Sequence, residues 1–191
     1  MYLRTILAAA MLALAGAACT SDDAEPGDSA SGSVPAADAP SSGDDLTDVT
    51  NFRLTMDKVD RYFDAQLAIA RRVKDLSPED RAPLEQMESS ANATLDDMAR
   101  RLESHPATRD GLREAGMPAR EFATLTMAMV QAGMAASVLK MRPNDDQDSL
   151  AREMKASMDN IRFMQENEAE LTRRQQELEA ELRKLGIVEG G

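Results

Sequence analysis

The longest uncharged stretch of the chain runs from Phe122 to Leu139, inside a segment that extends from Pro118 to Met141. Its apolar residues cover most of the circumference of a helix, a pattern typical of a helix enclosed by others. A run of about 18 apolar residues could also cross a membrane, but Thr, Gln, Gly and Ser interrupt this one and much of it is Ala. We therefore predict that 118–141 is the buried central helix of a helical domain.

The segments around this run have the period of amphipathic helices. Apolar side chains recur at three- and four-residue steps, and Ser, Thr, Pro and Gly stand where helices begin or end. Aromatic residues make up only 3% of the chain, while 13 residues are Met. A core of this composition favours helices over strands. We predict an all-α domain, a compact bundle of five to six helices. The expected helices cover 55–74, 83–104, 106–115, 118–141 and about 146–157, followed by a last helix closed by Gly186. A short first turn at Ser77 and Pro78 is expected to precede the helix over 83–104.

The last helix has the strictest spacing in the chain. Its apolar seam alternates four- and three-residue steps and consists of Leu171, Gln175, Leu178, Leu182 and Leu185. Such a helix should pack along one narrow line of contact. It either begins near Asp159 and runs through, or restarts at Asn167, whose side chain can cap it with Glu170 as the partner in a capping box.

Residues 1–18 have the parts of an export signal: a basic start, an apolar run and a group of small residues. Cys19 follows directly, and this arrangement resembles the lipobox of bacterial lipoproteins, in which the cysteine becomes acylated. Gly16 stands where that family usually has Leu, and ordinary cleavage after Ala17 is the alternative. The resemblance implies that Cys19 anchors the mature chain to a lipid bilayer in the cell envelope, and Thr20 after it favours the outer membrane.

The stretch that follows Cys19 is rich in Ser, Asp, Ala, Gly and Pro, and it has too few apolar residues to offset the entropy of ordering it. We predict a disordered acidic tether over 19–50, the helical domain over 51–187 and a disordered tail over 188–191. Eight carboxylates of this chain of net charge −12 lie between Asp22 and Asp48. The helical part is only mildly acidic and has no basic stripe, so nucleic acid is not an expected partner.

Candidate catalytic and metal-binding residues are few. His105 is the only histidine, which excludes His pairs and sites with several His ligands, and its place before Pro106 indicates a capping role for the next helix. Thioethers bind Cu(I), yet Met127, Met134 and Met141 recur every seven residues, as packing of one buried stripe requires. We predict no metal, no cofactor and no enzymatic activity.

Four short pieces of the chain resemble a family of exported, all-helical bacterial proteins. They are the run Phe52–Val59, the pair His105–Pro106, Gly116 with Arg120–Phe122, and the run Asn167–Leu171. The resemblance spans most of the chain after the tether and implies a helical fold and an envelope location, but no activity. Residues 171–175 also match the Leu-Thr-x-x-Gln signature of small helical periplasmic stress chaperones, although packing of the seam explains the same positions.

These features favour a non-catalytic binding module in the envelope. Met-lined surfaces repack around varied guests, so the expected guest is an apolar ligand or an amphipathic partner helix. Its lining is expected to come from Phe63, Phe122, Met127, Met134 and Met141. The alternatives are a scaffold that self-associates through the exposed edge of the 171–185 seam, a stress-chaperone-like protein, and an enzyme, for which the usual nucleophile, base and metal sets are absent.

Overall fold

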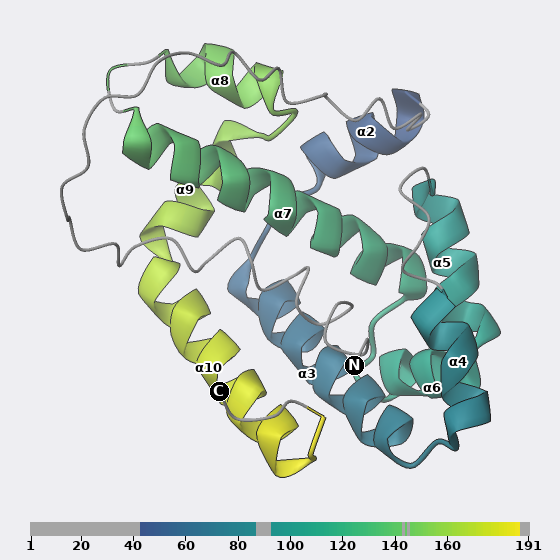
Figure 1. Cartoon of the computed structure of the whole chain (residues 1–191). Helices are drawn as coiled ribbons and strands as arrows, with labels where there is room; N and C mark the ends of the chain where they lie inside the picture. The colour runs from purple at the N-terminus through teal and green to yellow at the C-terminus, as the bar shows by residue number, and fades with distance from the viewer. Residues whose placement is uncertain (1–42, 87–92, 143, 145, 188–191) are drawn as a thin grey trace, which may run out of the picture.

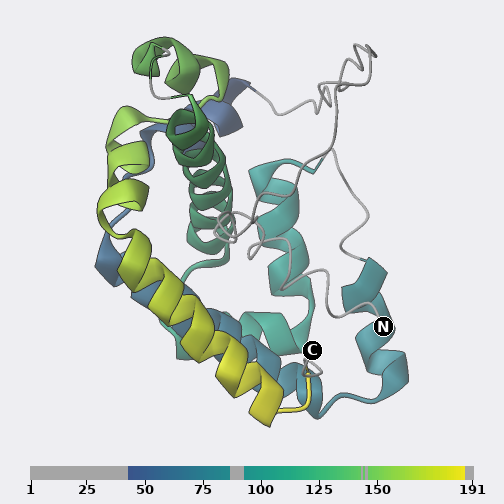
Figure 2. The same ribbon diagram turned by 60° about the vertical axis from the view of Figure 1, so that its left-hand side comes forward.

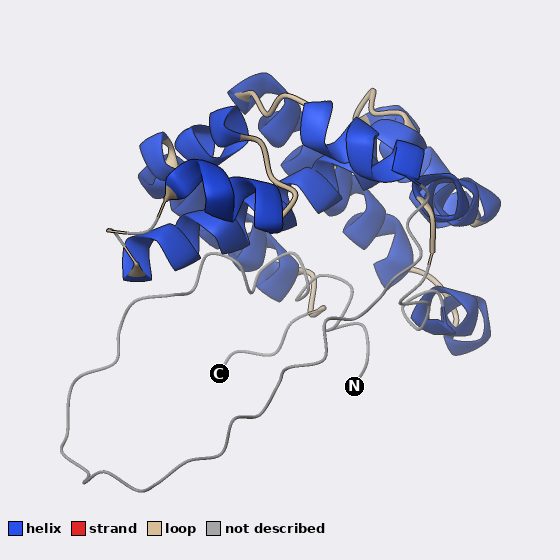
Figure 3. Cartoon of the chain, turned by 90° about the horizontal axis from the view of Figure 1, so that it is seen from above, coloured by secondary structure: helices blue, strands red, loops and turns tan. Residues whose placement is uncertain are grey.

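The computed structural model describes residues 43–86, 93–142, 144 and 146–187, and every regular element in them is an α-helix (Figures 1 and 3). The all-α prediction is therefore confirmed. In chain order the helices are α2 (Gly43–Asn51), α3 (Met56–Lys74), α4 (Pro78–Gln86), α5 (Leu95–Ser104), α6 (Pro106–Glu114), α7 (Ala119–Met141), α8 (Gln147–Glu153), α9 (Met158–Glu166) and α10 (Glu168–Lys184).

The long uncharged helix lies at the centre of the bundle, as predicted. α7 packs against α5 and α9 most extensively and also contacts α2, α3 and α8 (Figure 1). Leu125, Ala132 and Ala135 are fully buried on its inner side. By length and composition α7 could span a membrane, and half of its most apolar window is buried among the other helices. The prediction that other helices enclose this helix completely is wrong, however, because Met134 is 45% exposed and Met141 is 74% exposed.

The helices begin and end through local signals that the sequence carries. Thr55 caps α3 by accepting a hydrogen bond from Lys58 N at 3.4 Å. His105 caps α6, where its Nδ1 accepts from Ala107 N at 3.2 Å, and its Nε2 lies 3.1 Å from the carbonyl oxygen of Asp80 in α4. Gly116 closes α6 with a φ of 62°, in the left-handed region that a residue without Cβ adopts readily. The capping role predicted for His105 is confirmed.

Part of the segment predicted as tether is a helix packed on the bundle. In α2, Val49 is 3% exposed and joins the main core, and Asp45 accepts a hydrogen bond from Leu95 N at the start of α5 at 3.2 Å. Arg120 of α7 pairs with Asp48 at 2.7 Å and also with a carboxylate of α5. The boundary at residue 51 is therefore wrong, because Asp45 meets the N-terminus of α5 and Asp48 meets the guanidinium of Arg120.

The single helix predicted over 83–104 is also wrong. α4 runs from Pro78 through Pro83, and a separate helix, α5, begins at Leu95. Thr94 stops any continuous helix with an extended backbone and forms a full capping box with Asp97: each residue's side chain accepts from the other's amide, at 3.1 and 3.2 Å.

The C-terminal third is divided more finely than predicted. α8 ends at Glu153, Lys155 takes a left-handed φ of 54°, and α9 starts after Ser157. The restart of the last helix near Asn167 is confirmed, but its capping role is wrong, since Asn167 Nδ2 donates back to the carbonyl of Phe163 at 2.8 Å.

The seam of α10 packs inside the chain. Leu171, Leu178 and Leu182 are 0–5% exposed, and the last two meet Ala70 of α3. Figures 1 and 2 both show α10 lying alongside α3, at the edge of the bundle away from α5. The predicted narrow line of contact is confirmed, and it holds these two helices side by side.

Candidate functional site

The five predicted lining residues do not meet in one cavity. Phe63 and Phe122 both contact the ring of Tyr62, with centroid distances of 5.9 and 4.8 Å. Met127 packs half-buried against the main core, whereas Met134 and Met141 lie in solvent farther along α7. The predicted buried Met stripe is therefore wrong. Cys19 lies outside the described residues.

The aromatic cluster has a packing role. Tyr62 is 3% exposed, and its hydroxyl lies 3.4 Å from Thr126 Oγ1. Burial raises the pKa of the Tyr62 phenol, while hydrogen bonds with Thr126 and Gln66 lower it by less. The phenol therefore stays protonated near neutral pH, and the cluster supplies no base or nucleophile.

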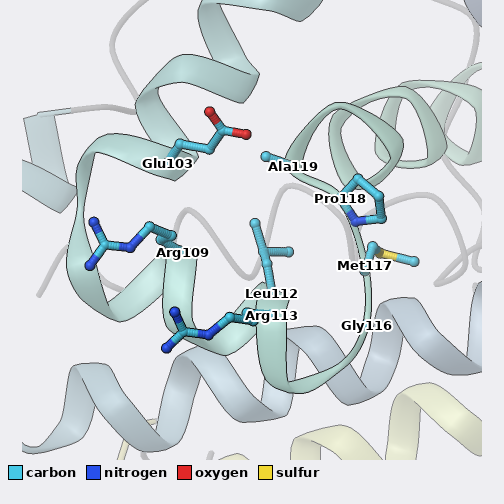
Figure 4. Close-up of a pocket in the computed structure, with 8 residues that line it drawn as sticks. All are labelled: Glu103, Arg109, Leu112, Arg113, Gly116, Met117, Pro118 and Ala119. Atoms are coloured by element: carbon cyan, nitrogen blue, oxygen red, sulfur yellow. The ribbon is translucent and has the colours of Figure 1, made fainter.

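A first surface hollow lies where α5, α6 and the start of α7 meet, with a volume of about 340 Å³. Leu112, Met117 and Ala119, all nearly buried, form its apolar floor. Figure 4 shows the carboxylate of Glu103 directed toward Ala119, while the guanidinium groups of Arg109 and Arg113 extend away from it.

The charges of this first hollow do not converge on a ligand position. Both arginines pair with Asp110, at 3.3 and 3.1 Å, within their own helix. Glu103 alone points inward, close to the positive end of α7. A site that orients a ligand needs several convergent polar groups, so this hollow is the weaker candidate.

A second and larger hollow, of about 440 Å³, is the open groove between α3 and α10. Phe63 and Leu67 of α3 and Leu178 of α10 form its floor. The first two are half-buried and Leu178 is 5% exposed, so apolar surface remains accessible between the helices. Charged side chains stand on both rims, namely Asp64, Arg174, Glu177, Glu181 and Lys184.

The cations of this groove are already paired. Arg174 lies 2.7 Å from Asp60 across the two helices, and Lys184 lies 2.5 Å from Glu181 within α10. Hydrogen bonding and charge from Lys184 lower the pKa of Glu181, so this carboxylate is ionised at neutral pH. Asp64 is exposed and has no ion pair within the part of the chain that the structure describes.

The described residues contain no group of three or more His, Cys, Asp or Glu side chains arranged to hold a metal ion. Of the predicted lining, only Phe63 belongs to the groove. Leu67 was missed because it lies beside the inward stripe of α3 rather than on it. The sequence does contain features that point to this groove. Phe63 and Leu67 stand one turn apart on α3, and the seam of α10 provides a second line of apolar residues.

Comparisons with protein-family models, with curated proteins and with solved structures found no match for this chain.

Proposed function

We propose that this protein is a non-catalytic binding module, exported and held in the cell envelope through an acylated Cys19, that binds an amphipathic segment of a partner in the groove between α3 and α10. The observation that carries the proposal is this groove, with an accessible apolar floor and charged rims on two parallel-lying helices. Amphipathic helices bind to other proteins by laying an apolar face into a groove of this kind.

The open shape of the groove favours a partner helix that lays a row of side chains into it over a small molecule that the pocket would enclose. Its volume of about 440 Å³ is in the lower part of the range for ligand pockets, about 300–1,000 Å³, which bury most of a ligand's surface. This groove is open along the helices instead. Phe63 and Leu67 lie one helical turn apart, which matches apolar anchors spaced three or four residues apart on a partner.

The seam of α10 does not support the scaffold alternative. Its leucines at 171, 178 and 182 are buried within the chain, and the last two pack against α3. A second copy could use them only by displacing α3, which would expose an apolar core cluster.

Binding is tested with fluorescently labelled amphipathic helical peptides and the purified full-length chain. Leu67→Ala removes half-buried floor and should weaken the best peptide about tenfold, which corresponds to about 1.4 kcal/mol. Met134→Ala is the matched control, because Met134 is exposed on α7, away from the groove. Loss of affinity in Met134→Ala with none in Leu67→Ala would move the site to α7. Absence of binding by cationic, neutral and anionic peptides alike would overturn the proposal.

Anchoring is tested separately, by intact mass and membrane fractionation of the protein from its host. The proposal expects a mature chain that begins at Cys19 and carries acyl groups, and it expects Cys19→Ala to be found in the soluble fraction. An unmodified chain that begins at Ala18 or later would contradict the anchor and leave the groove proposal standing.

A further inference from the structure

We infer that the occupant of the α3–α10 groove is a cationic amphipathic helix; this inference rests on the proposed function and specifies its partner. An acidic line of Asp57, Asp60 and Asp64 follows one side of α3 at steps of three and four residues. The last of these stands directly on the rim, beside the floor residues Phe63 and Leu67. Glu177 and Glu181 stand on the opposite rim.

The residues that line the groove include three carboxylates and two cations, so the cations do not fully cancel the negative charge of the rims. Arg174 pairs with Asp60 at 2.7 Å, and Lys184 pairs with Glu181 at 2.5 Å. Arg173, which reaches Glu177, also pairs with Glu170. Both cations that line the groove are thus shared with a carboxylate, and Arg71 of α3 adds positive charge near Glu181. Asp64 has no ion pair among the described residues.

The position of Asp64 sets where the partner's charge must lie. Asp64 follows Phe63 directly and precedes Leu67 by three residues, so its carboxylate stands beside the apolar floor at the level of both. A helix whose apolar face lies on that floor presents its flanking side chains to the rims. Lys or Arg three or four residues from the apolar anchors would then meet Asp64 and the α10 carboxylates.

Two-fold pairing of this chain along the α10 rim is disfavoured by the order of its charges. Along the rim of α10 the side-chain charges are positive, negative, negative and positive, at Arg174, Glu177, Glu181 and Lys184. In an antiparallel two-fold pairing about the middle of this series, Arg174 would face Lys184 and Glu177 would face Glu181. Symmetric interfaces must be self-complementary, and here like charges would oppose each other. An anionic lipid surface is disfavoured by the same carboxylates.

The test uses the full-length chain and three helical peptides of about 18 residues with one shared Leu stripe. Their flanking positions are Lys, Gln or Glu. The Lys peptide should bind most tightly and the Glu peptide at least about tenfold more weakly. This gap should narrow as salt rises from about 0.05 M to about 0.5 M, because exposed charges are screened.

The variant that isolates the charge is Asp64→Asn, which keeps the size of an exposed side chain. It should weaken the Lys peptide about two- to fivefold and leave the Gln peptide unchanged. Glu103→Gln is the matched control, since Glu103 is also an exposed carboxylate without an ion pair among the described residues, but it belongs to the other hollow. It should change neither affinity.

The outcomes separate this inference from the proposed function. Equal binding of all three peptides, or an unchanged affinity in Asp64→Asn, overturns the cationic partner while the groove proposal stands. Failure of every peptide to bind overturns the groove proposal itself. Self-association in sedimentation that Leu67→Ala abolishes would assign the groove to a second copy and overturn the inference as well.

Discussion

Gly111 provides the sharpest test of how this bundle is packed. It lies in α6 where that helix crosses α3, the most extensive contact between two described helices. A Cβ at this position would lie 2.7 Å from Ile69 Cγ1, 2.8 Å from Ile69 N and 2.9 Å from Ile69 Cα. Ordinary Cβ contacts are 3.4–4 Å. Gly111→Ala therefore requires the two helices to separate by roughly half an ångström or more in a close-packed contact.

Two effects of opposite sign determine how much Gly111→Ala changes the free energy of unfolding. Ala is favoured over Gly inside a helix by about 1 kcal/mol. Overpacking a filled contact typically costs about 1–3 kcal/mol. Two of the three close atoms belong to the main chain of Ile69, which no rotamer change can move, so the upper part of that range applies. We expect Gly111→Ala to lower the free energy of unfolding by about 1–2 kcal/mol.

The measurement is urea denaturation followed by circular dichroism, on the parent and on Gly111→Ala. Adding Ile69→Ala removes only the Cγ1 contact, so the double variant should recover little of the loss attributed to Gly111→Ala. Gly116→Ala is the control: its φ of 62° carries a backbone cost, but nothing lies within 4 Å of its Cβ position, so its cost should not depend on Ile69. A denaturation midpoint above the parent's, as expected for an unobstructed helical glycine, would refute the reasoning.

Three further predictions concern the helix ends and α2. Thr94→Ala should lower stability by about 1 kcal/mol in urea denaturation at neutral pH. Hydrogen bonds from Thr94 and Arg100 hold the pKa of Asp97 at about 2, below its ordinary 3.8, so the contribution of the Thr94 hydroxyl to the Asp97 carboxylate is complete above that ordinary value and is lost as pH falls through about 2. The bond from Asp97 N to Thr94 Oγ1 does not titrate, so the difference between the two proteins should narrow in acid without vanishing, and a difference that stays constant would contradict the assignment. Lys155→Gly should raise stability by about 0.5–1 kcal/mol because Gly adopts a φ of 54° without strain, and a lower thermal midpoint would count against it. Arg120→Met should speed amide exchange in α2 and leave exchange in α10 unaffected, because Arg120 pairs with Asp48 of α2. Arg113→Met is the control, since the ion pair of Arg113 lies within α6, and it should leave amide exchange in α2 unchanged; equal exchange in both variants would show that Arg120 does not hold α2.

Much of the fold could be predicted because its signals are local. The uncharged run fixes α7, and residues at the chain positions of caps fix where α3 and α6 begin and end. Thr55, His105 and Gly116 act on amides or on a backbone angle within a few residues of themselves. Such signals depend little on the rest of the structure.

The features that were missed depend on residues far apart in the chain. α2 is held by Val49 in the main core and by Asp45 at the start of α5, which its polar sequence alone does not reveal. Buried Asn160 holds the segment after α2, accepting from Leu54 N at 2.9 Å and donating to the carbonyl of Phe52 at 2.7 Å. These contacts span about a hundred residues, and no periodicity encodes them.

The groove between α3 and α10 could be anticipated only in part. An uncharged helix shows that neighbours surround it, yet it cannot show how many, and Met134 therefore lies exposed where a buried stripe was expected. The groove forms only because α3 and α10 lie side by side, more than a hundred residues apart in sequence. Of its floor, Phe63 was among the predicted lining residues, while Leu67 and Leu178 reach the groove only through the packing of the two helices.

The most direct test of the central claim is amide hydrogen exchange of the full-length chain with and without the Lys-flanked amphipathic peptide at saturation. Binding in the groove predicts added protection in residues 60–67 of α3 and 174–184 of α10, with none at the exposed C-terminal end of α7. The same pattern should be lost in Leu67→Ala. Protection confined to α7, or to the hollow between α5 and α6, would contradict the account.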